Sequence, residues 1–149
     1  MEDKKLFDIA LTYIGTPHIN GGNVKGAGLD CCSLITHMVK ESCGVDVPIV
    51  FGYSMDWFCK KECEELLKPY LDKYCFKVTE LKAGDILSFR WGRAEYAHLA
   101  MYIGDGFVIH CQADMGVEIT EVDSPYFFDA KGNSRLSGYW RLKDEFIQS

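Results

Sequence analysis

The sequence predicts a single α+β domain, and three observations support this class. Helical spacing of apolar residues dominates the first half of the 149-residue chain, and a two-residue alternation dominates the second half. No linker, repeat or low-complexity stretch interrupts residues 1–149, which we interpret as one domain. Hydrophobic residues make up 48% of the chain, enough for one core. The simplest assembly packs the helix that follows Asp30 on an antiparallel sheet of about five strands.

Three helices are predicted from apolar residues that recur three and four positions apart. The first covers residues 3–14 and ends at a Gly-Thr-Pro sequence. The second covers residues 30–43, with Asp30 as its N-cap and Gly44 as the glycine after its end. The third covers residues 54–67.

Strands are predicted from residue 76 onward, where the apolar period shortens to two. The six segments are 76–79, 85–91, 97–103, 107–112, 116–122 and 138–142. Gly104-Asp105-Gly106 predicts a tight hairpin between the third and fourth segments.

The charge of the chain excludes some function classes. A net charge of −6 repels nucleic-acid phosphates, so we expect no nucleic-acid partner. No apolar run reaches 18 residues, so we expect no membrane span. The N-terminal residues lack the apolar core of a signal peptide, and we therefore expect a protein that is cytoplasmic as synthesised.

The chain has seven cysteines, at positions 31, 32, 43, 59, 63, 75 and 111. Without a signal peptide, most should be reduced thiols. Cys43 and Cys75 fit buried structural positions. Cys59 and Cys63 lie four apart on a predicted helix, but zinc would need two further ligands that the sequence does not supply.

Cys31 is the first candidate for chemistry. If Asp30 caps the helix, Cys31 is its first residue, where free backbone N–H groups and the helix dipole favour a thiolate. Its own N–H could bind an oxyanion. The alternative is a structural cysteine. The preceding loop contains four glycines, which either let backbone approach a substrate or simply connect two elements.

His98 and His110 flank the predicted hairpin, and its register decides whether they can act together. A three-residue turn with Ile103 opposite Phe107 places His110 opposite Ala100 and His98 opposite Gln112, on one face. A two-residue turn places the histidines on opposite faces. The three-residue turn is favoured because Gly106 suits a left-handed position. His98 would then be a base whose tautomer is fixed by His110 or Gln112.

A metal site formed by Cys31, His98, His110 and Cys111 is the competing interpretation of these residues. Residues 110 and 111 point to opposite faces of a strand, so they cannot readily share one ion. We therefore expect neither a metal nor any other cofactor.

The sequence resembles the NlpC/p-sixty family of papain-like cysteine hydrolases. The segments that carry the resemblance are Gly15-Thr16-Pro17-His18 with Gly21-Gly22, Gly28-Leu29-Asp30-Cys31-Cys32-Ser33-Leu34-Ile35, Ala83-Gly84-Asp85-Ile86-Leu87-Ser88-Phe89, Ala97-His98-Leu99-Ala100-Met101-Tyr102-Ile103-Gly104 and Phe107-Val108-Ile109-His110. They occur in the family's order and cover residues 5–142. Phe89-Arg90-Trp91, followed by Ala97-His98, is most similar to phage-tail members.

The resemblance implies a papain-like fold and a Cys31–His98–His110 triad. It also implies hydrolysis of bacterial cell-wall stem peptides, often between D-γ-glutamate and a diamino acid, through a thioester. Substrate contacts are expected from His18, Gly21, Gly22, Asp30 and Gln112. The phage-tail likeness implies a virion-associated enzyme with tail-protein partners. A prophage remnant and a bacterial cytosolic enzyme are the alternative settings.

Three departures from the family pattern affect particular roles. Cys32 replaces the usual serine and Ser33 the usual glycine, so two thiols are adjacent. Cys31 is the expected nucleophile because it follows the aspartate directly and lies on the apolar stripe, whereas Cys32 lies about 100° further round the helix. His18 replaces a tyrosine, which affects substrate recognition more than the reaction.

Two other functions remain open on the same fold. One is an N-acetylmuramoyl-L-alanine-type amidase, and the other is a catalytically silent phage-tail subunit. Residues 123–133, which include Pro125, Tyr126 and Phe127, are predicted to form a loop that shapes the cleft.

Overall fold

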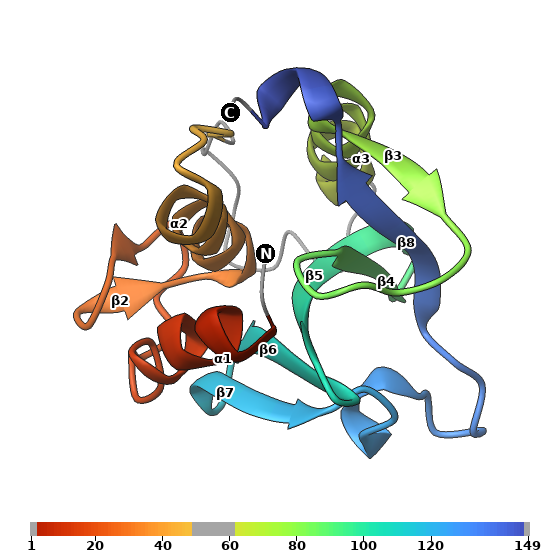
Figure 1. The fold of residues 1–149 in the computed structure, drawn as a ribbon. Helices are drawn as coiled ribbons and strands as arrows, with labels where there is room; N and C mark the ends of the chain where they lie inside the picture. The colour runs from red at the N-terminus through yellow and green to blue at the C-terminus, as the bar shows by residue number, and fades with distance from the viewer. Residues whose placement is uncertain (1–2, 49–61, 148–149) are drawn as a thin grey trace.

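The computed structural model describes residues 3–48 and 62–147, and these form an α+β fold (Figure 1). Its helices are α1 (Asp3–Leu11), α2 (Cys31–Cys43) and α3 (Glu62–Tyr74), and the short 3₁₀ helices are η2 (Pro125–Phe127) and η3 (Asp144–Phe146). The strands are β1 (Asn23–Val24), β2 (Gly28–Leu29), β3 (Cys75–Val78), β4 (Ile86–Trp91), β5 (Ala94–Gly104), β6 (Phe107–Gln112), β7 (Gly116–Glu121) and β8 (Leu136–Leu142). The predicted fold class is confirmed.

The main sheet of the described residues has six strands in the order β3-β8-β4-β5-β6-β7, rather than about five. Every neighbouring pair is antiparallel. Consecutive strands from β4 to β7 pair as a meander. The last strand, β8, returns between β3 and β4, so the sheet is not a meander throughout. β1 and β2 form a separate small ribbon.

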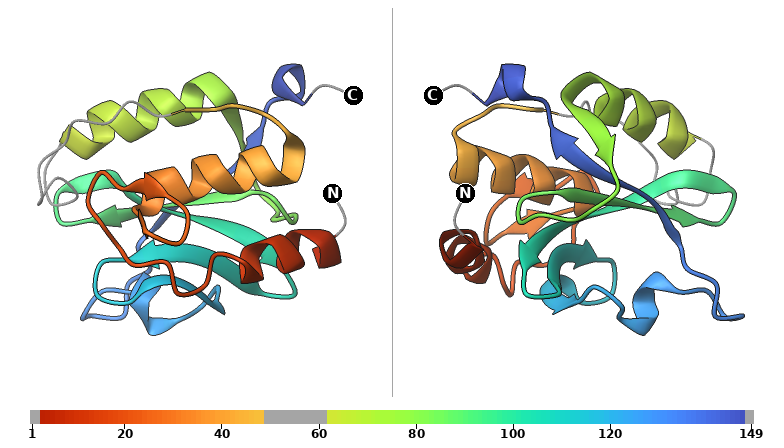
Figure 2. Two further views of the ribbon diagram at one scale, coloured as in Figure 1. Left: turned by 90° about the vertical axis from the view of Figure 1, so that its left-hand side faces the viewer. Right: turned by 45° about the vertical axis from the view of Figure 1, so that its right-hand side comes forward.

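The sheet separates two apolar layers. Helices α1, α2 and α3 pack on one face, where buried side chains such as Leu34, Leu71 and Leu99 form the larger core. The η2 segment covers the other face, and its Phe127 ring stacks on Phe89 with centroids 4.4 Å apart. Figure 2 shows α2 and α3 on one side of the strands and the η2 segment on the other.

Two helix ends differ from the predictions. α1 stops at Leu11 instead of residue 14, because the Thr12 hydroxyl and N–H both bond to the carbonyl of Ile9 and tighten the turn. α3 continues through Pro69 to Tyr74 instead of ending at residue 67. Leu67, Leu71 and Tyr74 are all buried, and this packing outweighs the hydrogen bond lost at the exposed proline. The predicted start of this helix, at residue 54, lies outside the described residues, as does Cys59.

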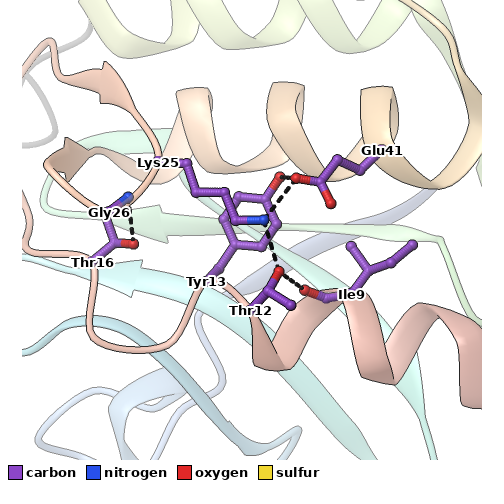
Figure 3. A network of polar contacts seen from close by, with 7 residues as sticks. All are labelled: Ile9, Thr12, Tyr13, Thr16, Lys25, Gly26 and Glu41. Atoms are coloured by element: carbon purple, nitrogen blue, oxygen red, sulfur yellow. Dashed lines mark hydrogen bonds and ion pairs between the residues drawn. The ribbon is translucent and has the colours of Figure 1, made fainter.

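A polar network joins α1, the glycine-rich loop and α2 (Figure 3). The Lys25 ammonium donates to Glu41 and to the Thr12 hydroxyl, each at 2.8 Å, and lies 4.0 Å from the centroid of the Tyr13 ring. The Tyr13 hydroxyl donates to the same Glu41 oxygen at 2.7 Å. The network therefore fastens the loop to the helix whose first residue is Cys31.

Candidate active site

Cys31 is the first residue of α2, as predicted, and Asp30 is its N-cap. The Asp30 Oδ1 accepts from the N–H groups of Cys32 and Ser33 at 3.0 and 2.9 Å. The Ser33 hydroxyl accepts in return from the N–H of Asp30 at 2.9 Å, which completes a capping box. Burial raises the pKa of the Asp30 carboxyl, although these hydrogen bonds oppose the rise. The helix start is thus closely fixed.

The glycine-rich loop packs directly against this helix start. The N–H of Gly21 donates to Asp30 Oδ2 at 3.0 Å, and the Ser33 hydroxyl donates to the carbonyl of Gly22 at 2.6 Å. A Cβ on Gly22 would lie 2.8 Å from the carbonyl oxygen of Gly28, so a side chain there would collide with backbone. Only glycine permits this approach.

The hairpin between β5 and β6 has the predicted register at the histidines, but the predicted turn is wrong. Ala100 pairs with His110, whereas Gly104, not Ile103, pairs with Phe107. The turn therefore has two residues, Asp105 and Gly106, both with positive φ, at 53° and 83°. The ladder shifts between Tyr102 and Gly104, which leaves Ile103 as the extra residue of a bulge. The bulge restores the register that brings the histidines to one face.

The two histidines make a direct hydrogen bond, with His98 Nε2 lying 2.9 Å from His110 Nδ1. His110 Nε2 lies 3.0 Å from Glu118 Oε1 on β7. Gln112 does not hold His98 in this structure. Its amide donates instead to the same Glu118 oxygen at 3.2 Å. His110, rather than Gln112, is therefore the group that fixes the orientation of His98.

Both imidazoles are buried, with 7% of His98 and none of His110 exposed. Burial, followed by the nearby charges of His110 and His18, lowers the pKa of His98 well below its ordinary value. Burial also lowers the pKa of His110, against the opposing effect of Glu118. A resting His98 is consequently neutral near pH 7 and able to accept a proton.

Cys31 and His98 line the same cleft, which has a volume of about 690 Å³. Its lining consists of His18, Ile19, Asn20, Asp30, Cys31, Trp91, Ala97, His98, Cys111, Gln112, Ala113, Asp114 and Tyr126. Tyr126 belongs to η2 and lines the cleft, so the prediction that residues 123–133 shape the cleft is confirmed at this residue. The centroids of the Trp91 and Tyr126 rings lie 4.8 Å apart, and the two rings form an aromatic wall next to His98.

The predicted site residues divide into three groups by position. Cys31, His98, His18, Asp30 and Gln112 line the cleft, whereas His110 lies behind His98. Gly21 and Gly22 support the helix start and are not among the lining residues, so their contact with a substrate stays a prediction. Cys32 is 1% exposed, its Sγ lies 3.7 Å from that of Cys31, and it is also absent from the lining.

Several residues of the site were not predicted, among them Glu118, Trp91 and Asp114. The sequence does not distinguish Glu118 from a surface residue, because a glutamate on a half-polar strand is usually exposed. Its place opposite His110 follows from the β6–β7 pairing. Trp91 and Asp114 enter the cleft from ends of strands and loops, which a single sequence does not bring together.

Cys111 has a structural contact, since its thiol donates to the carbonyl of Leu29 at 3.2 Å. Within residues 3–48 and 62–147, no group of three or more histidine, cysteine or acidic side chains is arranged to hold a metal ion. None of the helices in the same ranges is long and apolar enough to cross a membrane.

Comparison with known proteins gives consistent matches. A model of the NlpC/P60 family matches residues 15–133. The chain is 29% identical over 133 residues to a gamma-D-glutamyl-L-lysine dipeptidyl-peptidase of Bacillus cereus. It is 24% identical over 123 residues to the murein DD-endopeptidase MepS/murein LD-carboxypeptidase of Escherichia coli strain K12. These matches cover 87% and 83% of this chain, but the chain spans only 35% and 56% of those relatives.

Solved structures share the fold. A crystal structure of an NlpC/P60 family protein from Bacillus cereus has a TM-score of 0.66 at 24% identity, over 99% of this chain and 41% of that one. The NlpC/p60 domain of the peptidoglycan hydrolase SagA has a TM-score of 0.57 at 21% identity, over 96% of this chain and 99% of that one. The family match covers most of the chain and agrees with the shared fold, and this protein therefore belongs to the NlpC/P60 family.

Proposed function

We propose that this protein is a cysteine peptidase that hydrolyses amide bonds in the peptides of bacterial cell walls. The observation that carries the proposal is the 2.9 Å hydrogen bond between His98 and His110, beside a cleft that Cys31 also lines. A thiol at a helix N-terminus and a buried, oriented imidazole are the groups that thiol-dependent acyl transfer requires. Membership of the NlpC/P60 family supports the same reaction class.

In the proposed reaction, His98 accepts the Cys31 proton at Nδ1, because Nε2 is bound to His110. The thiolate attacks the substrate carbonyl, a C–S bond forms, and the oxygen becomes an oxyanion. Asp30 uses the N–H groups of Cys32 and Ser33, so the N–H of Cys31 can donate to this oxyanion.

The tetrahedral intermediate then collapses and the C–N bond breaks. The leaving amine takes the proton from the His98 imidazolium, and the acyl group remains on Cys31 as a thioester. Water gives a proton to neutral His98 and attacks the thioester. The products are a carboxylic acid and the free Cys31 thiol, so the enzyme is regenerated.

We propose the bond between D-γ-glutamate and a diamino acid as the one that is cut. The name of the Bacillus cereus relative, at 29% identity, supports this choice. The cleft offers Trp91 and Tyr126 as an apolar wall and the exposed Asp114 carboxylate, which could attract a substrate ammonium group. The phage-tail setting and the site of action stay predictions.

The test compares wild type, Cys31→Ala and Cys32→Ser on defined muropeptides, with products identified by mass spectrometry. We expect Cys31→Ala to lower the rate at least about a thousandfold while the circular dichroism spectrum is unchanged. Cys32→Ser is the matched control because it alters the adjacent thiol, and it should keep most of the activity.

The product masses discriminate among the candidate reactions. A free L-alanyl-D-glutamate end supports the proposed bond, whereas an intact stem peptide released from the sugar would show an amidase. Wild type without turnover on any muropeptide, or Cys31→Ala with the wild-type rate, would exclude the proposed peptidase.

A further inference from the structure

Glu118 lies behind the two histidines and outside the cleft. It pairs with His110 across β6 and β7, and its side chain is 29% exposed. One of its oxygens, Oε1, is 3.0 Å from His110 Nε2 and 3.2 Å from the Gln112 amide. Hydrogen bonds thus run continuously from Glu118 through His110 to His98.

The chemistry of a carboxylate fixes the direction of every bond in this chain. An ionised carboxylate only accepts hydrogen bonds, so the neutral His110 ring must carry its proton on Nε2. Its Nδ1 is then a lone pair, which can only accept from His98 Nε2–H. That assignment leaves the lone pair of neutral His98 on Nδ1, the nitrogen that the proposed mechanism needs as base.

We propose that Glu118 is a positioning residue that acts through His110 to set the tautomer of His98 and to stabilise its imidazolium. The inference rests on the proposed function, because it assigns a role in that reaction. Without the carboxylate, His110 could carry its proton on Nδ1 and donate to His98 Nε2. His98 would then hold its own proton on Nδ1 and could not accept the one from Cys31.

Other titratable and charged groups surround the pair and must be considered with it. His18 faces His98 from the glycine-rich loop, and Tyr126 packs within 5.7 Å of both rings from η2. Burial raises the pKa of the Tyr126 hydroxyl, the charges of Cys31 and Asp114 raise it further, and that of Arg135 lowers it. Glu118 differs from these groups because it hydrogen-bonds the pair directly.

The kinetic test uses Glu118→Gln, which keeps an acceptor oxygen but loses the charge, and Glu118→Leu, which loses both. We expect kcat to fall about tenfold in Glu118→Gln and about a hundredfold in Glu118→Leu. KM should be nearly unchanged in Glu118→Gln, because Glu118 does not line the cleft and the glutamine keeps an acceptor for the Gln112 amide. The acid limb of kcat/KM, where protonation of His98 removes the base, should move to lower pH by about half a unit or more in Glu118→Gln, because the imidazolium loses a nearby anion.

Glu121→Gln is the matched control. Glu121 is an exposed glutamate on the same strand, opposite Phe107, and its substitution removes the same charge without touching the histidines. It should keep both the wild-type kcat and the wild-type pH profile. An unchanged pH profile and kcat in Glu118→Gln, in an active enzyme, would overturn the role of Glu118 and leave the peptidase intact.

A second readout does not depend on turnover. Nitrogen-15 NMR of the imidazoles reports which ring nitrogen carries the proton. We expect both His98 and His110 to be protonated on Nε2 in wild type, and His110 to lose this preference in Glu118→Leu. Protonation of His110 on Nδ1 in wild type would overturn the inference even if the enzyme proved inactive on every muropeptide.

Discussion

Asp30 shows how much of the site depends on one side chain. Its carboxylate is 1% exposed and accepts hydrogen bonds from three backbone N–H groups, two on the helix and one on the glycine-rich loop. Burial of a charge is costly unless such partners compensate for it. The same bonds determine where the Cys31 sulfur lies relative to the cleft. The stability of the fold and the placement of Cys31 therefore depend on the same contacts.

We expect Asp30→Ala to destabilise the protein by roughly 2–4 kcal/mol, because it removes the N-cap and leaves buried N–H groups without an acceptor. Asp30→Asn keeps Oδ1 for the helix and should cost only about 1 kcal/mol. Urea unfolding measures both. Asp46→Ala serves as the control: this exposed partner of Lys40 should change stability by less than about 0.5 kcal/mol. Equal losses for Asp30→Ala and Asp30→Asn would contradict the capping explanation.

At the scale of elements, the β5–β6 hairpin determines whether the two histidines meet. Its two-residue turn alone would put them on opposite faces, and the bulge at Ile103 corrects the register. Asp105 and Gly106 both occupy the left-handed region, which agrees better with the twist of a hairpin than an ordinary turn does. The pairing of the catalytic candidates thus depends on local backbone chemistry far from the cleft.

Gly106→Ala should lower the free energy of unfolding by about 1 kcal/mol, because alanine is strained at a φ of 83°. Asp105→Asn, at the neighbouring position, should be neutral or slightly stabilising, since asparagine tolerates positive φ well. Chemical denaturation of the two variants beside wild type tests the turn. Loss of stability in Asp105→Asn with none in Gly106→Ala would exclude this turn geometry.

The same hairpin shows what could be predicted from the sequence. The face shared by His98 and His110 follows from side-chain alternation once a register is chosen. The predicted register is correct at the histidines, although the three-residue turn from which it was predicted is wrong. The bulge was not predictable, because one extra residue is absorbed by packing that the sequence does not display. The cap at Asp30 was predictable since it is local. The role of Glu118 was not predictable, because its contact with His110 depends on the pairing of β7 with β6, which the sequence alone does not show.

For the molecule as a whole, the buried imidazoles couple folding to pH. The pKa of His98 and that of His110 are both lowered in the folded protein, chiefly by burial. The unfolded chain therefore binds protons more readily than the folded chain once pH falls below about 6.5, the ordinary histidine value. Stability should rise with pH wherever the unfolded state holds more protons, so acidification weakens the fold.

We expect the free energy of unfolding to fall between pH 7.5 and pH 5.5, with each of the two histidines contributing at most about 1.4 kcal/mol. Burial raises the pKa of the Asp30 carboxyl toward this window, so the comparison with His98→Gln is what isolates the histidine contribution. Urea unfolding at pH 7.5, 6.5 and 5.5 measures the change. His98→Gln should show a shallower dependence, and His37→Gln, which alters a partly exposed histidine on α2, should follow wild type. If the free energy of unfolding depended on pH equally in wild type and His98→Gln, burial of His98 would not resist its protonation. The assignment of His98 as a neutral resting base would then be wrong.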